Sequence, residues 1–250
     1  MRLKYPLLIT TVALLVFLFF YVFPLPCTPP SREIAITIDD IPMERSSFIK
    51  IMEHFKSYHV PVTAFVIANR VNADEFSYLN SLRNSQFIIG SHSYSHPSLR
   101  RISAKQYIAD IKQADTLLAS LMSEPKYYRY PYLAMGSWFK KRQVLHYLTE
   151  NKYTVAPVTI DSRDFLLNIE FCAHPPTKAF IDQIRQRYLD FVWQQTIAAE
   201  RGQRCNGTKQ ILLIHANVLN SYFLGDLLKM YQEHGYRFIS LGEALATDHR

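Results

Sequence analysis

The stretch Glu33-Ile34-Ala35-Ile36-Thr37-Ile38 is an apolar run that ends directly on two acidic residues, Asp39 and Asp40. A short run of this kind, rich in β-branched side chains, is typical of a buried strand. The chain then carries apolar residues at helical spacing over 47–58, which predicts a helix. This βα unit is the first of a series that continues to the C-terminus.

Short apolar runs alternate with amphipathic stretches along the rest of the chain. We expect strands at 33–38, 62–68, 87–90, 127–130, 153–160, 211–214 and 238–241, and helices at 47–58, 73–82, 103–122, 137–149, 178–199 and 222–234. Strands that alternate with helices indicate a parallel sheet. About seven βα units within roughly 210 residues predict an α/β fold, a distorted (β/α)7-type barrel, rather than two domains.

The N-terminus does not follow this pattern. Arg2 and Lys4 precede an uncharged run over 7–23, which is near the lower length limit for crossing a bilayer. The positive residues predict that this end stays in the cytoplasm, and the lack of an Ala-x-Ala site favours an uncleaved signal anchor over a cleaved peptide. We expect one transmembrane signal-anchor helix and a proline-rich spacer at 1–30, with the domain at 31–250 on the extracytoplasmic (periplasmic or extracellular) side of the membrane.

The composition describes one well-filled domain. Hydrophobic residues make up 48% of the 250 residues and glycines number only seven, which excludes a disordered or low-complexity chain. The net charge of +7 is scattered, whereas a nucleic-acid footprint would be concentrated, so we expect no nucleic-acid partner. Attraction to an anionic wall or membrane surface is the other reading of this charge.

The three cysteines, Cys27, Cys172 and Cys205, form no C-x-x-C pair, which argues against a cysteine zinc site. In an oxidising compartment Cys172 and Cys205 could form a disulfide, and two free thiols are the alternative. The stretch 168–207 is long for one connection. It either covers a substrate groove or only packs against the barrel.

Ionisable side chains follow five of the expected strands. The carboxyl ends of barrel strands converge on one face, where active sites form. These side chains are Asp39 and Asp40, then His92 and His96, then Arg129, then Asp161 and Asp164, and finally His215. Five such sets in register predict one active site.

The first two of these sets predict a metal site. The adjacent carboxylates of Asp39 and Asp40 repel each other unless a cation or a shared proton relieves them. Two imidazoles four residues apart, His92 and His96, can join one carboxylate in a His₂Asp set that leaves a coordination position open for water. The residues alone therefore indicate metal-assisted hydrolysis, with zinc first and cobalt, nickel or manganese as alternatives.

At these residues the sequence resembles the polysaccharide deacetylases, the carbohydrate esterases that share the nodulation-protein-B homology domain. The resemblance covers roughly 34–241, with the motifs in order. The matching motifs are Thr37-Ile38-Asp39-Asp40, His92-Ser93-Tyr94-Ser95-His96, Arg129-Tyr130-Pro131-Tyr132, Asp161-Ser162-Arg163-Asp164-Phe165 and Leu212-Leu213-Ile214-His215. The resemblance implies metal-dependent hydrolysis of the N-acetyl group of an N-acetylated poly- or oligosaccharide, with release of acetate.

The resemblance also implies a role for each site residue. Asp40, His92 and His96 would hold one divalent metal, and Asp39 would be the general base that activates the attacking water. Arg129 would keep Asp39 charged.

In the same resemblance, the backbone N–H of Tyr132 would stabilise the oxyanion. His215 would be the general acid that protonates the departing amine, and Asp164 would tune the pKa of His215.

The chain also departs from the family pattern. Ile41-Pro42 stands where Gly-Pro is usual, which changes the loop after the base. Phe165 replaces a tryptophan in the wall of the sugar-binding groove. Asn217 and Asn220 follow His215 closely and either contact substrate or, for Asn220, cap a helix.

Two other functions are compatible with the sequence. A metal-dependent amidohydrolase on a small non-sugar amide would have a closed pocket rather than an open groove. An inactive carbohydrate-binding envelope protein would have lost Asp39, a metal ligand or His215, and none of these is lost. The sequence leaves open which glycan is the substrate (peptidoglycan, chitin oligomers, an exopolysaccharide or a lipid-linked glycan), which metal is bound in vivo, whether the N-terminal segment is cleaved, and the oligomeric state.

Overall fold

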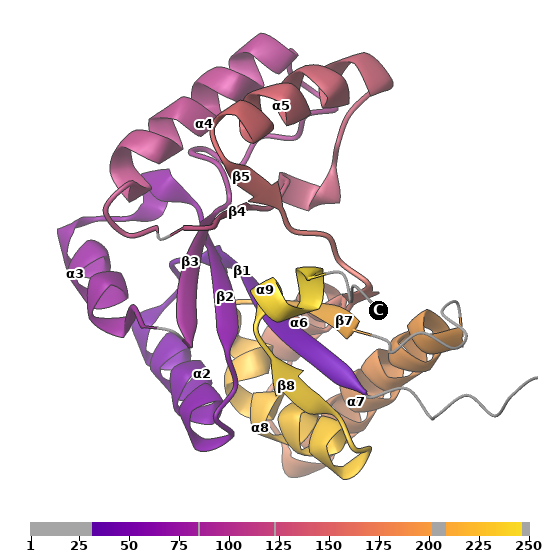
Figure 1. Ribbon diagram of the computed structural model, residues 1–250. Coiled ribbons are helices and arrows are strands. Elements are labelled where there is room, and N and C mark those ends of the chain that lie inside the picture. Colours follow the sequence, from indigo (N-terminus) through magenta and orange to yellow (C-terminus); the bar gives the residue numbers. More distant parts are fainter. Residues whose placement is uncertain (1–31, 85, 123, 202–208, 247–250) are drawn as a thin grey trace, which may run out of the picture.

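The computed structural model describes residues 32–84, 86–122, 124–201 and 209–246, which form one parallel sheet surrounded by helices (Figure 1). The strands are β1 (Glu33–Ile41), β2 (Val62–Val66), β3 (Phe87–Ser91), β4 (Lys126–Tyr128), β5 (Tyr153–Val155), β6 (Ile160–Asp161), β7 (Lys209–His215) and β8 (Arg237–Ile239). The sheet has the order β5-β4-β3-β2-β1-β7-β6, and β8 pairs with the first three residues of β1.

The helices follow the strands in the expected alternation. They are α2 (Arg45–Ser57), α3 (Ala73–Leu82), α4 (Ala104–Leu118), α5 (Trp138–Glu150), α6 (Asp164–Ala173), α7 (Lys178–Arg201), α8 (Val218–Glu233) and α9 (Leu241–Leu245), with short 3-10 turns at η1 (Ala68–Arg70) and η2 (Pro131–Leu133). Ser103 and Gln106 form a capping box that begins α4, as their spacing predicts. Helix α6 was not expected from the sequence.

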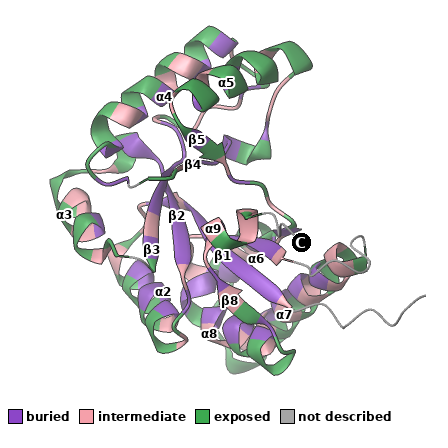
Figure 2. Ribbon diagram, in the orientation of Figure 1, coloured by how far each residue is buried: buried purple, intermediate pink, exposed green. Residues whose placement is uncertain are grey.

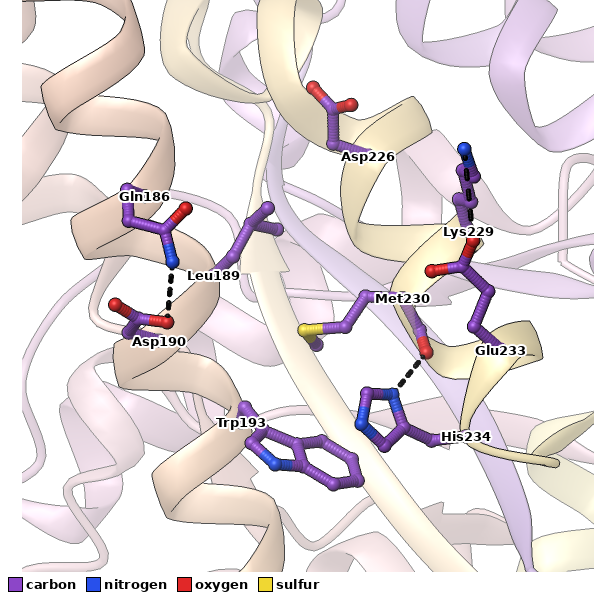
Figure 3. A pocket seen from close by; sticks show the side chains of 9 residues that line it. All are labelled: Gln186, Leu189, Asp190, Trp193, Asp226, Lys229, Met230, Glu233 and His234. Carbon is purple, nitrogen blue, oxygen red and sulfur yellow. Dashed lines mark hydrogen bonds and ion pairs between the residues drawn. The ribbon is translucent and has the colours of Figure 1, made fainter.

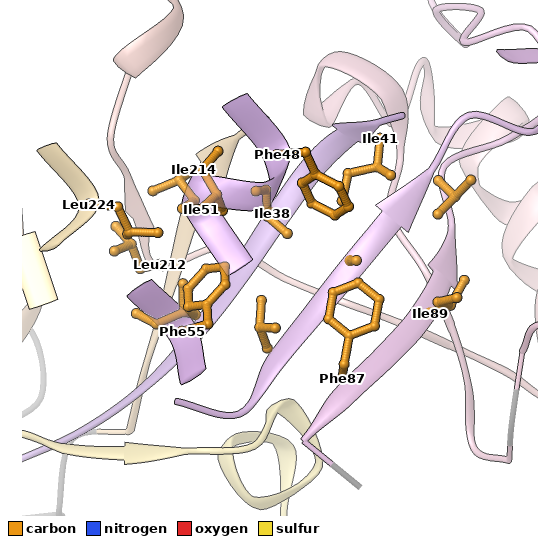
Figure 4. Packing of buried hydrophobic residues seen from close by; sticks show 14 of the residues in the cluster. Ile38, Ile41, Phe48, Ile51, Phe55, Phe87, Ile89, Leu212, Ile214 and Leu224 are labelled. Atoms are coloured by element: carbon orange, nitrogen blue, oxygen red, sulfur yellow. The ribbon is translucent and has the colours of Figure 1, made fainter. Parts of the chain in front are cut away.

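The core explains why β1 reads as a continuous apolar run. Its alternate residues point to opposite faces, and both faces are covered (Figure 2). Ile38 joins Phe48 and Ile51 of α2 in the cluster between the sheet and the helices (Figure 4). Ala35 belongs to a smaller cluster on the other face of the sheet. Since Thr37 and Asp39 alternate with Ile38, they share the face of Ala35.

The sheet is an open half-barrel, not a closed barrel. The single strand expected at 153–160 is two strands, β5 and β6, which do not pair with each other. Between them the Ala156 N–H donates to the Tyr128 carbonyl, and the Thr159 N–H donates to the Ile211 carbonyl on the far side of the gap. Pro157 has no N–H to extend a ladder, which accounts for the break.

The expected membrane anchor lies outside the described residues. Within those residues, no helix has the length and apolar character needed to span a bilayer. Cys172 is exposed, and Cys205, with which it could form a disulfide, also lies outside the described residues, so both alternatives for this pair stay open. The long stretch before β7, 168–207, contains most of α6 and all of α7, which contact each other and α8.

Candidate active site

The carboxyl ends of the strands bring the expected residues together. Asp39 of β1 pairs with His215 of β7 in the sheet register. Asp39 Oδ2 lies 3.7 Å from His92 Nε2 and 3.6 Å from Arg129 Nη1. Residues more than 170 positions apart in the sequence therefore surround one point at the end of β1.

Three of these residues form a triangle of metal-ligating atoms. Asp40 Oδ1 lies 3.2 Å from His96 Nε2 and 3.5 Å from His92 Nε2, and the two Nε2 atoms are 3.1 Å apart. Ligands about 2.0–2.1 Å from a tetrahedral ion lie about 3.3 Å from one another. The buried Asp40 Oδ1 has no hydrogen-bond partner. The site therefore fits a small divalent cation.

The ring of His92 is oriented for this role. His92 Nδ1 lies 2.9 Å from the Arg129 carbonyl oxygen. Because a carbonyl only accepts, Nδ1 must carry the proton and Nε2 presents its lone pair to the triangle. Burial alone would raise the pKa of Asp40, but the contacts and charges of His92 and His96 outweigh burial and hold this pKa well below its ordinary range. The Asp40 carboxylate is thus held in its ionised, metal-binding form.

The histidine loop, residues 92–96, is held in place by Asp110, which no sequence motif marks. Asp110 of α4 accepts hydrogen bonds from the backbone N–H groups of Tyr94 and Ser95, at 2.8 and 3.1 Å. It also accepts from the Ser95 hydroxyl. No pattern in the sequence distinguishes Asp110 from other polar residues on a helix surface, because its role depends on the tertiary approach of α4 to the loop.

Several site residues adopt the left-handed backbone conformation that side chains disfavour. The values of φ are 67° for Asp40, 70° for Ser93, 58° for His96, 56° for Tyr132 and 48° for Arg163. Residues in this region of φ and ψ are uncommon and cluster at functional sites, where the surrounding structure compensates for the strain. The loops that carry the ligands are therefore shaped for the site rather than for local stability.

Asp39 faces a buried positive charge. Arg129 is fully buried, its Nη2 donates to the Thr37 hydroxyl at 3.1 Å, and its guanidinium lies over the Phe65 ring at 4.6 Å. Burial lowers the pKa of Arg129, and the charge of Asp39 opposes this effect. The other carboxylate oxygen, Asp39 Oδ1, has no hydrogen-bond partner and can accept a proton.

His215 is paired with a second carboxylate. Its Nδ1 lies 2.6 Å from Asp164 Oδ1, and its backbone N–H donates to Asp164 Oδ2 at 2.7 Å. Burial alone would lower the pKa of His215, but the hydrogen bond and charge of Asp164, together with the charges of Asp39 and Asp40, raise it to about 9. The ring is thus held protonated, and Nε2 is the nitrogen left to donate.

Two exposed aromatic rings flank these groups. Tyr132 is 67% exposed, and its ring centroid lies 4.5 Å from that of His96. Phe165 is 45% exposed and lies 5.7 Å from the His215 ring. Both rings therefore offer apolar faces to solvent beside the reactive groups.

Other polar residues near the motifs have structural contacts. Asp161 accepts a hydrogen bond from the Arg163 N–H and shapes the turn after β6. Asn217 caps α8 through the N–H of Asn220. Asn220 is fully buried, so the expectation that it contacts substrate is not met, and it is not the helix cap either.

A half-barrel of parallel strands thus brings together a His₂Asp triangle, an Asp39–Arg129 pair and a His215–Asp164 pair at the ends of its strands. The family model for polysaccharide deacetylase matches residues 27–156. This chain belongs to the polysaccharide deacetylase family.

Known relatives and structures agree with this assignment. The chain is 30% identical over 217 residues to the peptidoglycan-N-acetylmuramic acid deacetylase PdaC of Bacillus subtilis, which is 86% of this chain and 39% of that protein. It is 29% identical over 135 residues to a peptidoglycan-N-acetylglucosamine deacetylase of Bacillus cereus, 53% of this chain and 46% of that protein. The matched part thus spans less than half of either relative.

A solved structure shares the fold. The structure of a CE4-family pseudoenzyme from Bacillus anthracis superposes with a TM-score of 0.63 at 15% identity, over 88% of this chain and 67% of that one. At this level of identity the similarity concerns the fold alone.

Proposed function

We propose that this protein removes the N-acetyl group from an N-acetylated glycan by metal-dependent hydrolysis and releases acetate. The observation that carries the proposal is the triangle of Asp40, His92 and His96 beside the unpaired oxygen of Asp39. Its edges of 3.1–3.5 Å match the spacing of ligands around one small divalent ion. Zinc is the first candidate, and cobalt, nickel or manganese suit the same donors.

In the proposed reaction Asp39 accepts one proton and His215 donates another. A bound divalent ion supplies Lewis acidity, which makes water more acidic and polarises a carbonyl group. Asp39 takes a proton from the attacking water through its unpaired Oδ1, while Arg129 Nη1 lies 3.6 Å from the other carboxylate oxygen. His215, protonated on both nitrogens, gives the Nε2 proton to the departing amine. The family resemblance assigns the oxyanion to the backbone N–H of Tyr132.

Two exposed aromatic rings favour a glycan as the substrate. Tyr132 lies beside His96 and Phe165 lies beside His215, both with exposed rings, and apolar ring faces suit the stacking of sugar rings. A small-amide hydrolase is the alternative, and it would enclose its substrate. An inactive glycan-binding protein is a further alternative, because one neighbour in fold is described as a pseudoenzyme.

We also propose that the chain is anchored by its uncharged N-terminal run, with the domain outside the cytoplasm. The support is the sequence alone: Arg2 and Lys4 precede an uncharged stretch at 7–23 and a proline-rich spacer. An extracytoplasmic position would bring the site to cell-wall or surface glycans.

The substrate proposal is tested by comparing acetylated substrates. We would assay acetate release from chitooligosaccharides, peptidoglycan fragments and small acetamides, using the full chain in detergent with added zinc or cobalt. Release from a glycan that both Asp39→Asn and His92→Ala abolish supports the proposal. Release from small acetamides alone would favour the amidohydrolase, and no release from any substrate despite metal binding would favour the inactive protein.

A further inference from the structure

A series of buried hydrogen bonds connects His215 with α7. Asn220 of α8 donates through Nδ2 to Asp164 Oδ2 and, at 2.8 Å, to the His215 carbonyl oxygen. Its Oδ1 accepts the hydroxyl proton of Tyr188 of α7 at 2.8 Å. Asn220, Asp164 and Tyr188 are all fully buried. None of these contacts is explained by helix packing, for which apolar side chains would be sufficient.

The three partners fix the orientation of the Asn220 amide. Asp164 Oδ2 and the His215 carbonyl oxygen only accept, so the NH₂ end must face them. The Tyr188 hydroxyl then donates to the amide oxygen. A flipped amide would place its oxygen against two other oxygens in a fully buried site, which is strongly unfavourable. Tyr188 therefore determines which end of Asn220 faces the carboxylate.

Asn220 in turn completes the contacts of the Asp164 carboxylate. Asp164 Oδ1 accepts from His215 Nδ1, whereas Oδ2 accepts from the His215 backbone N–H and from Asn220. Without Asn220 a buried lone pair of Oδ2 would lose its donor, and one constraint on rotation of the carboxylate would be lost. The orientation of the His215 ring depends on that carboxylate, because His215 Nδ1 lies 2.6 Å from Asp164 Oδ1.

We propose that Tyr188 and Asn220 are positioning residues that hold Asp164, and through it His215, in the geometry from which the ring delivers a proton to the leaving amine. The inference rests on the proposed function, in which His215 is the general acid. It gives the stretch before β7 a role that neither groove covering nor simple packing describes. Helix α7 becomes the outer support of the acid.

The same two helices contain a matched control. Thr196 of α7 and Tyr231 of α8 form a hydrogen bond of 2.8 Å that is also fully buried, and neither contacts Asp164. A separate groove of about 320 Å³ between α7 and α8 is lined by Trp193, Met230, His234 and other residues, none of them from the site (Figure 3). Tyr188→Phe and Tyr231→Phe each remove one buried hydroxyl between α7 and α8. Only Tyr188 belongs to the hydrogen-bonded relay that runs through Asn220 and Asp164 to His215.

The test compares two substrates that differ in their leaving group. An N-acetylglucosamine oligomer releases an amine that needs a proton, whereas 4-nitrophenyl acetate releases a phenolate that does not. We expect Tyr188→Phe to lower kcat on the oligomer about 10-fold and Asn220→Ala about 100-fold, with KM unchanged. Both variants should keep kcat on the aryl ester within about 2-fold of Tyr231→Phe, because water activation does not involve His215.

Equal losses on both substrates, or equal effects of Tyr188→Phe and Tyr231→Phe, would overturn the proposal. A second readout does not depend on activity. The NMR signal of the His215 Nδ1 proton should shift or broaden in Tyr188→Phe and Asn220→Ala and stay in place in Tyr231→Phe. If the wild type releases no acetate, the proposed function fails while this signal still decides whether the relay holds His215.

Discussion

At the scale of single residues, two aspartates at strand ends have different surroundings. Asp40 Oδ1 lies within 3.5 Å of two imidazole nitrogens, whereas Asp161 only accepts a hydrogen bond from the turn that follows it. The sequence alone presents both as carboxylates at the carboxyl end of a strand. The register of the neighbouring strands and the approach of the histidine loop decide which of them can bind a cation.

We predict that Asp40→Asn weakens zinc binding by more than about 100-fold, because the loss of partners outside the ligand set already costs about 10- to 100-fold. Asp161→Asn is the matched control and should bind zinc as the wild type does. Isothermal titration of the stripped proteins measures both affinities. Similar affinities for wild type and Asp40→Asn would remove Asp40 from the ligand set.

The pairing of His215 with Asp164 predicts a pH dependence. His215 acts when protonated and its pKa is raised to about 9, so the rate should fall as pH rises through about 9. In Asp164→Asn the charge that raises this pKa is lost and the amide oxygen can accept only a weaker, neutral hydrogen bond, so the fall should move toward the ordinary value of 6.5.

The pH profile of kcat from pH 5 to 10 measures this shift. A pKa near 6.5 lowers the protonated fraction of His215 at pH 7 by roughly 4-fold, and the complete loss of a general acid, about 10²–10⁴-fold, is the upper limit of the effect. The His215–Asp164 pair also stabilises the folded state in a pH-dependent way. Because the pKa of His215 is raised in the folded state, this stabilisation is fully present below pH 6.5 and is lost as pH rises through about 9. An alkaline limb that stays in place in Asp164→Asn would exclude His215 as its origin.

At the scale of elements, α4 supports the metal site without contributing a ligand. Asp110 accepts from two backbone N–H groups of the histidine loop. We predict that Asp110→Ala weakens zinc binding about 10-fold, because the loop that presents His96 loses its support. The measurement is again a zinc titration.

Asp115 lies on the same helix and accepts from the hydroxyls of Tyr147 and Tyr153, neither of which belongs to the histidine loop. Asp115→Ala should therefore leave zinc affinity unchanged, although it removes buried hydrogen bonds. If both variants weaken zinc binding equally, general destabilisation of α4 rather than the loop contact is responsible.

The elements also show how far the sequence leads. Apolar periodicity is strong over 73–82, and the helix there has the expected bounds of Ala73–Leu82. The expected strand at 153–160 fails because Pro157 interrupts it, and periodicity does not record a missing N–H donor. The relay through Asn220 and Tyr188 could not be predicted, because it joins residues whose proximity exists only after α7 and α8 have packed.

At the scale of the whole molecule, the site brings together the ends of strands from both halves of the chain. Asp39 and Arg129 are buried and Asp40 is half-buried beside them, so two carboxylates share one guanidinium, which costs free energy when no metal cation is present. A ligand that binds only the folded state stabilises it, by about 2.7 kcal/mol at 100 times its dissociation constant.

We therefore predict that zinc raises the melting temperature of the stripped protein in a concentration-dependent way, and that His92→Ala abolishes the rise. Differential scanning calorimetry of the full chain in detergent provides the measurement. A rise that persists in His92→Ala would place the stabilising ion elsewhere.

The most direct test of the proposed metal-dependent deacetylation is a titration of the stripped full chain with zinc while acetate release from an N-acetylated glycan is followed. We predict that the rate rises up to one equivalent of zinc per chain and then stays level, and that Asp39→Asn binds the same equivalent without releasing acetate. A rate that does not depend on added zinc, or that Asp39→Asn leaves unchanged, would contradict it.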